Sequence, residues 1–232
     1  MKSFKLVFLS SIIAIMFFQF RSYSQENLGA LNLKTDNDTL SYSFGLLIGN
    51  NMLLQGVHQI NQDLFLKGLQ HGLGQDSAWL RFEEANIFLQ RYFDKQVQAQ
   101  AMKNLEAGKA FLEQNKKKEG VVSLPDGLQY KVLVAGEGKS PAPEDKVTVH
   151  YVGKLIDGTI FDSSIERNEP VSFQVDQVIK GWTEALQLMK TGSKWELYIP
   201  PDLAYGDKGA GDVIGPNETL VFEVELLSIE SK

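Results

Sequence analysis

The spacing of hydrophobic residues divides the chain into three parts. Residues 6–20 form a nearly unbroken apolar run of 15 residues. Between residues 38 and 119, apolar side chains recur every three to four positions, which is the period of an amphipathic helix. From residue 128 onward they alternate with polar ones, which is the period of a half-buried strand. The pattern therefore predicts an apolar leader, a helical region and a β-rich domain.

The leader has the layout of a secretory signal peptide. Lys2 and Lys5 precede the apolar run, and Ser22 and Ser24 stand at the −3 and −1 positions of a cleavage site before Gln25. The alternative is a membrane anchor, but a spanning helix needs about 20 apolar residues. We expect a signal peptide over residues 1–24 and an exported protein without a membrane anchor. In a Gram-negative bacterium that protein is expected to be periplasmic.

Residues 25–81 are expected to form short helices. Apolar residues follow helical spacing from 38 to 50, with Asp38 or Thr39 as the expected N-cap, and a second helix is expected after Asn61 or Asp63. A helical region of about 60 residues buries too small a share of its surface to be stable alone. We therefore expect a homodimer formed through residues 36–95, with two copies completing one core.

Residues 82–119 predict one long linking helix. The segment has no proline and is rich in Glu, Gln, Lys and Ala, which are good helix formers. Its first half is apolar over a wide arc and is expected to be buried. Its second half carries only a narrow apolar stripe and is expected to be more exposed. The helix is expected to join the dimerisation region to the β-rich domain.

The third part, residues 120–232, predicts an antiparallel sheet wrapped on one short helix, and the fold class is α+β. Glycine and proline turns separate the strand candidates. The candidates are 128–135, 146–155, 171–175, 194–199 and 219–229, and the short helix spans 182–189.

Composition removes several kinds of chemistry. The chain has no cysteine, which excludes disulfides, thiolate zinc sites and a cysteine nucleophile. Its histidines, His58, His71 and His150, form no close metal-ligand pair, so no metal or cofactor is expected. Strand alternation also places His150 on the opposite face from Tyr151. Residues 123–232 hold ten basic and eighteen acidic side chains, a net charge of −8, which argues against nucleic-acid binding.

Three stretches of the β-rich domain resemble the FKBP-type peptidyl-prolyl cis-trans isomerases. They are VHYVGKLIDGTIFDSS at 149–164, VIKGWTEALQLMKTGSKWELYIPPDLAYG at 178–206 and TLVFEVELLSI at 219–229. The helical region and the junction KKKEGVVSLPDGLQYKVLVAGEGKSP at 116–141 resemble the secreted Mip group of this family (macrophage infectivity potentiator type). In that group a helical domain dimerises and a long helix carries the isomerase domain.

The resemblance implies an apolar pocket that favours the twisted amide of an X–Pro bond. Trp182 would form its floor, and Phe161, Phe173 and Phe222 its aromatic walls. Polar groups would come from Tyr151, Asp162, Tyr205 and the backbone amide of Ile179, with Arg167 paired to Asp162. The other implied substrate-binding residues are Val171, Val178, Val213 and Ile214.

The resemblance also implies partners. Unfolded or exported proteins that contain proline are the expected substrates, and macrolide inhibitors are expected ligands. Val171, Ala210 and Gly215 stand where the eukaryotic pattern usually has Phe, His and Pro, which bears on macrolide affinity and substrate preference. The alternative function is a non-catalytic periplasmic chaperone or scaffold that holds unfolded chains in the helical dimer cleft.

Overall fold

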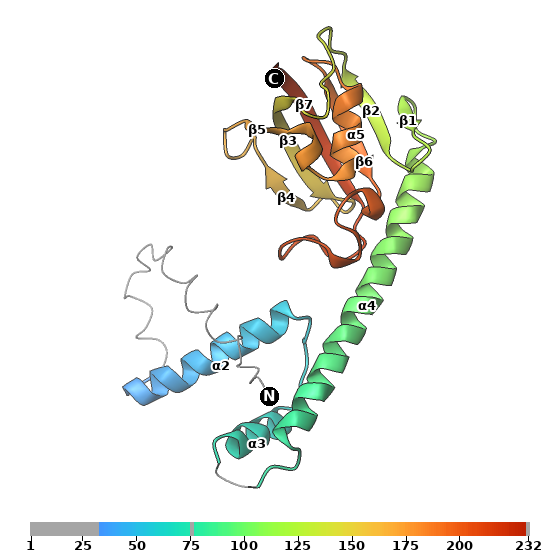
Figure 1. Cartoon of the computed structure of the whole chain (residues 1–232). Coiled ribbons are helices and arrows are strands. Elements are labelled where there is room, and N and C mark those ends of the chain that lie inside the picture. The colour runs from blue at the N-terminus through green and yellow to red at the C-terminus, as the bar shows by residue number, and fades with distance from the viewer. Residues whose placement is uncertain (1–32, 75–76, 231–232) are drawn as a thin grey trace, which may run out of the picture. The chain divides into compact units, whose positions relative to one another are not determined.

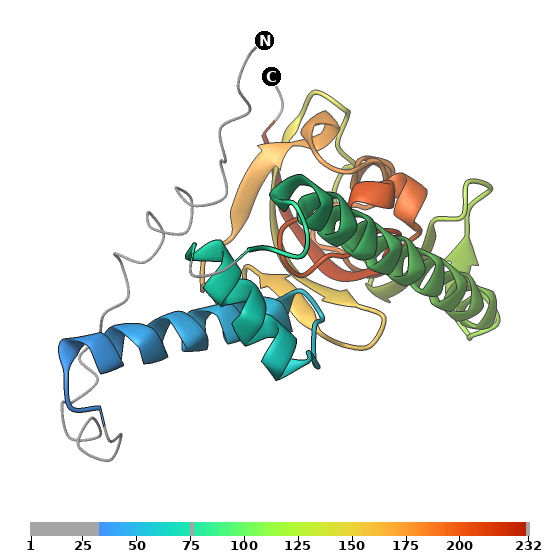
Figure 2. The same ribbon diagram turned by 90° about the horizontal axis from the view of Figure 1, so that it is seen from below.

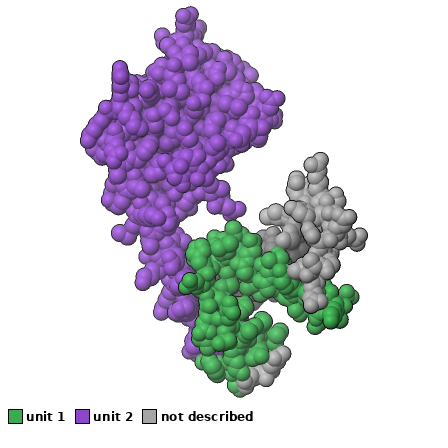
Figure 3. Space-filling model, turned by 180° about the vertical axis from the view of Figure 1, so that it is seen from behind, with its two compact units in different colours: residues 1–79 green, residues 80–232 purple. Residues whose placement is uncertain are grey.

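The structure, a computed structural model, describes residues 33–74 and 77–230 (Figure 1). The predicted signal peptide, residues 1–24, lies outside the described residues. The chain divides into two compact units, residues 1–79 and residues 80–232, which Figure 3 distinguishes by colour. Within the described ranges, every helix is too short or too polar to cross a lipid bilayer.

The first unit contains α2 (Asp36–Leu54) and α3 (Gln62–Gly72). Thr35 is the N-cap of α2: its hydroxyl accepts from the Asp38 amide at 3.1 Å, and the Asp38 carboxylate accepts from the Thr35 amide at 2.9 Å. The expectation that Asp38 or Thr39 caps this helix is therefore wrong, because Asp38 fills the third helical position of a capping box. Asn61 caps α3, as expected.

Neither α2 nor α3 has a buried residue in the single chain. Large apolar side chains on both helices face solvent; Phe44 is 60% exposed and Leu64 56%. Such surface is unfavourable in water, because each apolar Å² left uncovered forgoes about 25 cal/mol of stabilisation.

The second unit begins with α4 (Phe82–Asn115), a helix of 34 residues. Its first half is exposed in the single chain, where Phe82 is 75% and Phe88 65% accessible. Its buried residues are Asn104, Gly108 and Asn115, all in the second half. In the single chain the second half is thus the more buried one, against expectation. It packs on the β-rich domain through Gly108 and also through Asn104 and Asn115, which an apolar periodicity does not register.

The β-rich domain is a twisted antiparallel sheet in the order β1-β2-β6-β7-β3-β4, with β5 pairing β3 in addition. Five strands were expected. Those at 146–155 and 194–199 have the expected bounds, and two short strands, β1 and β4, are additional. The strands are β1 (Val121–Ser123), β2 (Gln129–Val134), β3 (Lys146–Leu155), β4 (Ile160–Ser163), β5 (Val171–Gln174), β6 (Lys194–Ile199) and β7 (Leu220–Glu230).

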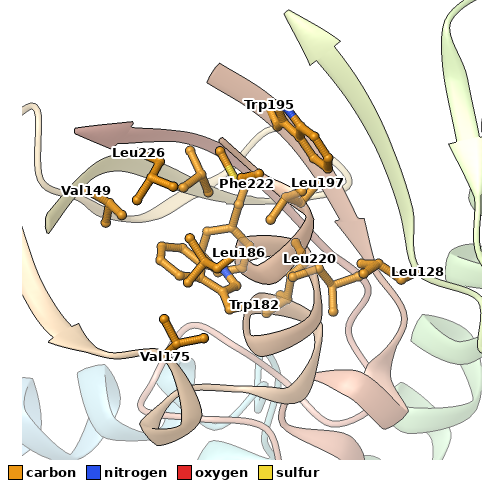
Figure 4. Packing of buried hydrophobic residues seen from close by; sticks show 14 of the residues in the cluster. Leu128, Val149, Val175, Trp182, Leu186, Trp195, Leu197, Leu220, Phe222 and Leu226 are labelled. Carbon is orange, nitrogen blue, oxygen red and sulfur yellow. The ribbon is translucent and has the colours of Figure 1, made fainter. Parts of the chain in front are cut away.

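Between the strands lie α5 (Lys180–Leu188) and three short 3₁₀ turns, η2 (Val175–Gln177), η3 (Pro201–Leu203) and η4 (Gly206–Lys208). One face of α5 packs into the concave side of the sheet, and its Trp182 and Leu186 meet Leu197, Phe222 and other strand residues there (Figure 4). This close contact needs Gly181, since a Cβ there would lie 2.5 Å from the Ile199 side chain.

A β-bulge in β7 returns Ile229, near the end of the strand, to the core side. Val149 of β3 pairs with Leu226, whereas the preceding Thr148 pairs with Ser228, so Leu227 is the extra residue. Phe222, Val224 and Leu226 are buried, and Leu227 is exposed. The bulge lies beyond these three residues, and their plain alternation directs the Phe222 side chain into the space between the sheet and the start of α5.

Candidate active site

A cavity of about 750 Å³ opens between the sheet, the start of α5 and the loop that follows η4. A volume of this order is typical of a site for a small ligand or a short peptide segment. Its lining consists mostly of aromatic and aliphatic residues. They are Tyr151, Phe161, Asp162, Val171, Phe173, Gln177, Val178, Ile179, Trp182, Tyr205, Ala210, Gly211, Asp212, Val213, Ile214 and Phe222.

Trp182, the third residue of α5, is 5% exposed and forms the floor. Its ring is met edge-on by Tyr151, with centroids 5.3 Å apart, and by Phe222 at 5.1 Å. Phe173 lies 5.5 Å from it at a tilt. Edge-to-face contacts of this kind are favourable for aromatic pairs beyond their area of burial. The floor is therefore a fixed aromatic surface.

Phe161 of β4 completes the walls, with its ring edge-on to Phe222 at 5.5 Å. Gly153 of β3 makes room for both rings, because a Cβ at this position would lie 2.6 Å from Phe161 and 2.7 Å from Phe222. A glycine in the middle of a buried strand weakens the strand. Here it allows two phenylalanines to approach the β3 backbone.

The polar edge of the cavity consists of Tyr151, Asp162 and Arg167. The Tyr151 hydroxyl donates to Asp162 Oδ2, and Arg167 Nη1 donates to Asp162 Oδ1. Arg167 Nη2 also donates to the Tyr151 hydroxyl oxygen at 3.2 Å. Both oxygens of the carboxylate are thus engaged, and the side chain of Asp162 is held in one orientation.

Electrostatics agree with this geometry. Burial tends to raise the pKa of Asp162, but hydrogen bonds from Tyr151 and Arg167 outweigh it and leave the pKa below its ordinary value of 3.8. Burial, with the hydrogen bond to Asp162, raises the pKa of Tyr151. At neutral pH the edge therefore holds an ionised carboxylate and a neutral phenol.

Tyr205, just before η4, and Val213 and Ile214, in the loop after it, also line the cavity. Ala210 N donates to Ile214 O at 2.8 Å, and Ile214 N donates to Ala210 O at 3.2 Å, so the tip is a small closed turn. Gly209 permits this closure with a φ of 66°, since a Cβ there would lie 2.1 Å from Ile214 O. Tyr205 precedes the turn and is 41% exposed at the mouth of the cavity.

Ile179 is the N-cap of α5, and its carbonyl accepts from Trp182 N at 2.9 Å and from Thr183 N at 3.0 Å. The N–H of an N-cap residue has no acceptor within its own helix. Because Ile179 also lines the cavity, this amide is placed at the pocket edge.

All of the predicted site residues except Arg167 line the cavity, and Arg167 contacts it through Asp162 and Tyr151. The sequence reasoning did not assign Gln177, Ala210, Gly211 and Asp212 to the site. Their position beside predicted site residues could have identified them, because Gln177 precedes Val178 and the other three lead up to Val213.

His150 lies outside the cavity, and its Nδ1 is 3.0 Å from the Ser164 hydroxyl. This agrees with its expected place on the face of β3 opposite Tyr151. Among the residues that the structure describes, no three His, Cys, Asp or Glu side chains are close enough to hold a metal ion.

Comparisons with known proteins agree with this fold and site. Residues 137–227 match the family model of the FKBP-type peptidyl-prolyl cis-trans isomerase, and residues 37–132 match the model of the domain amino terminal to that isomerase. The outer membrane protein MIP of Legionella longbeachae is 48% identical over 209 residues, covering 87% of this chain and 89% of that protein. The peptidyl-prolyl cis-trans isomerase Mip of Coxiella burnetii is 46% identical over 212 residues, covering 88% and 91%.

Among solved structures, the crystal structure of FkpA from Escherichia coli is 37% identical, with a TM-score of 0.69. The match covers 85% of this chain and 98% of that one. An antiparallel sheet wrapped on a short helix, with an aromatic pocket between them, defines a peptidyl-prolyl isomerase of the FKBP class. The chain belongs to the FKBP-type peptidyl-prolyl cis-trans isomerases and resembles their Mip proteins over most of its length.

Proposed function

We propose that the 750 Å³ cavity is the isomerase site and that it binds the proline ring of an X–Pro segment against Trp182. The observation that carries the proposal is the asymmetry of the lining: aromatic rings form the floor and the walls, and the fixed polar groups lie at one edge. An apolar ring fits the aromatic surface, and the polar backbone beside that ring fits the edge.

The chemistry requires such a pocket. Rotation about the peptide bond has a barrier of about 18–20 kcal/mol, because it breaks the resonance between nitrogen and carbonyl. The amide at 90° is less dipolar than either planar form. An apolar pocket therefore stabilises the twisted form relative to the planar ground state, which is the differential binding that lowers a barrier.

Two donors are proposed to hold the carbonyl oxygen as it turns: the Tyr205 hydroxyl and the Ile179 amide. Tyr205 stands at the mouth, and Ile179 stands where α5 begins. Asp162 and Tyr151 are proposed to fix the polar edge, with Arg167 holding Asp162 in place. Every group in this mechanism is a side chain or a backbone amide of the chain, and none changes its protonation state.

We propose proline-containing segments of unfolded, exported proteins as the substrates. Uncatalysed X–Pro isomerisation takes tens to hundreds of seconds at 25 °C and limits the folding of many chains.

The proposal that the protein is exported rests on the leader sequence. Mass spectrometry of the protein recovered from its native cell should give a chain that begins at Gln25. Retention of Met1 would contradict cleavage.

We also propose a homodimer formed through residues 36–95. The support is the apolar surface that α2, α3 and the first half of α4 leave exposed in the single chain. A C2 pair is the commonest way for identical chains to cover such a surface. The alternative, a scaffold that holds unfolded chains in the helical dimer cleft, needs the same dimer, so isomerase activity and not the oligomeric state separates the two functions.

The test of the proposed function has two parts. The intact protein should accelerate both cis–trans exchange in a short X–Pro peptide and a proline-limited refolding reaction. A macrolide inhibitor of this family should compete in the peptide assay and quench the fluorescence of Trp182. Peptide isomerisation that persists when the cavity is filled by such a ligand would contradict the assignment of this cavity.

A further inference from the structure

The loop between η4 and β7 contacts two different parts of the second unit. Its tip, residues 210–214, lines the cavity. Its base, residues 215–219, lies against the second half of α4, as Figures 1 and 2 allow the reader to follow. A single short segment thus joins the long helix to the wall of the candidate active site.

The base of the loop and α4 exchange hydrogen bonds in both directions. Asn104, which is 7% exposed, donates from Nδ2 to the carbonyl of Pro216 at 2.9 Å. Asn217 donates from Nδ2 to the carbonyl of Ala101, one turn earlier in the helix, at 3.4 Å. Gln100 donates to Asn104 Oδ1 at 2.6 Å and so fixes the orientation of that amide.

One turn further along α4, Gly108 is buried against Thr219. A Cβ at Gly108 would lie 2.3 Å from the Thr219 hydroxyl oxygen and 3.1 Å from its Cβ. Glycine is unfavourable in a helix interior by about 1 kcal/mol relative to alanine. At this position it lets the helix backbone lie directly on Thr219, the residue that precedes β7.

Backbone hydrogen bonds close the loop at both its neck and its tip. Asn217 N donates to Gly206 O at 2.8 Å, which closes the neck of the loop. The paired hydrogen bonds between Ala210 and Ile214 close its tip. Gly215 connects the two, and a Cβ there would lie 3.2 Å from Asn104 Nδ2, so the connection itself touches the helix.

We propose that α4 positions this loop at the active site, with Asn104 and Gly108 as positioning residues for isomerisation. Residues 101–108 fix the base, the closed neck and tip transmit that placement, and Val213 and Ile214 are thereby held at the cavity wall. The inference rests on the proposed assignment of the cavity as the isomerase site. Neither residue touches the cavity, so their effect must pass through the loop.

The test uses two substitutions in the intact protein. Gly108→Ala pushes Thr219 away, and Asn104→Ala removes the hydrogen bond to Pro216. Each should lower kcat/KM for an X–Pro peptide by roughly 3- to 30-fold, mainly through KM, because the wall that the peptide contacts is displaced. Adding Thr219→Ala to Gly108→Ala removes the hydroxyl that the new methyl meets, and should restore most of the activity.

A second readout does not depend on activity. In ¹³C-methyl spectra of the same variants, the methyl signals of Val213 and Ile214 should shift, whereas those of Val171 on β5 should stay. Glu106→Ala, on the exposed face of the same helix, is the matched control and should move neither signal. General destabilisation would not select the loop methyls over Val171.

The outcomes are distinct. The proposal would be overturned if Gly108→Ala and Asn104→Ala both behaved like the Glu106→Ala control, with the same kcat/KM and the same methyl signals of Val213 and Ile214. Shifted loop methyls with unchanged kcat/KM would support the coupling of α4 to the loop and would count against the cavity as the isomerase site.

Discussion

The hydroxyl of Tyr151 donates a hydrogen bond to Asp162 across the β3–β4 pair, at the one polar edge of an aromatic cavity. Tyr151 is two residues from Gly153, which pairs with Asp162 in the sheet. The side-chain bond therefore follows from the strand register. Arg167 occupies the other carboxylate oxygen, so the edge keeps its geometry without any contribution from a ligand.

Tyr205→Phe should lower isomerase activity and leave the fold intact. It removes one hydroxyl at the mouth of the cavity, and the loss of a single hydrogen bond is worth about 1–3 kcal/mol, or roughly 5- to 150-fold in kcat/KM. The measurement is peptide isomerisation beside a thermal melt. Tyr130→Phe, on β2 and stacked on Trp195, is the control. Equal activity in the two variants would remove Tyr205 from the mechanism.

Asp162→Asn should reduce activity with a change in unfolding free energy below about 1 kcal/mol, because exposed ion pairs contribute little. The side chains of Asp162 and Arg167 are 40% and 47% exposed. Asp202→Asn, at an exposed site outside the cavity, is the control for loss of a charge. Unchanged turnover in Asp162→Asn would show that the carboxylate is dispensable.

The pH profile of the wild-type protein should be flat near neutrality. The pKa of Asp162 is lowered in the folded state, so its ionised interactions are present above its ordinary pKa of 3.8 and are lost as pH falls through the lower folded value. Activity should accordingly hold from pH 6 to 8. A step in kcat/KM within that range that Asp162→Asn abolishes would contradict this assignment.

Trp182→Ala should cost both stability and activity. A large aromatic side chain removed from a packed core typically costs about 3–5 kcal/mol. Trp195→Ala is the matched control, because Trp195 is also buried but lies outside the cavity. Both variants should unfold at a lower denaturant concentration than the wild-type protein. Only Trp182→Ala should lose activity per folded molecule. Full activity in folded Trp182→Ala would exclude Trp182 as the floor of the site.

Stability should decline as pH rises through neutrality because of Glu184 on α5. A hydrogen bond with Asp126, together with burial and the charge of Asp126, raises the pKa of Glu184 to about 7. A raised folded pKa contributes stability that is complete below the ordinary value of 4.5 and is lost as pH rises through about 7. The melting temperature should therefore be higher at pH 5 than at pH 8. Glu184→Gln should flatten that slope, and a wild-type melting temperature that is constant over this range would refute the prediction.

The protein should be a dimer by light scattering at micromolar concentration, because the first unit and the first half of α4 expose apolar surface in the single chain. Phe88→Gln removes one such side chain, 65% exposed, and should weaken the dimer. Val132→Gln, 43% exposed on β2, should have no effect on assembly. A scattering mass equal to that of one chain, which is 26.0 kDa when the leader is included, would contradict the proposed dimer.

Sequence pattern predicted the β-rich domain well where alternation is long and turns are strong. The bounds of β3 and β6 follow from it. It missed β4, which has four residues and lies just after the turn at Gly158, because so short a run has too few positions to show a period of two. The cavity residues came from the resemblance to a family, since aromatic residues in a small β domain are otherwise ordinary core candidates.

The second half of α4 was mispredicted for a different physical reason. Periodicity counts apolar area, whereas this face of the helix is buried through Asn104, Gly108 and Asn115. Asn115 donates to the Gln129 side chain at 3.0 Å, and the Gln129 amide donates to Leu112 O at 3.0 Å. These amide contacts add to the packing of Phe111 on Tyr198, whose ring centroids lie 6.0 Å apart, and one sequence alone does not indicate which asparagine has such a partner.

The second half of α4 is attached to the β-rich domain, and this attachment fixes the rotation of the first half about the helix axis. Contacts begin at Ala101, so residues before it are free of the domain's hydrogen bonds. Each residue inserted there would turn the preceding part of α4 by about 100° and move it by about 1.5 Å, while the cavity and its loop stay as they are. Seven inserted residues, about two helical turns, would nearly restore the original direction of that part of the helix and place it farther from the domain. The direction in which the pocket faces relative to the apolar face of the first half of α4 is therefore set by the number of helical residues between them.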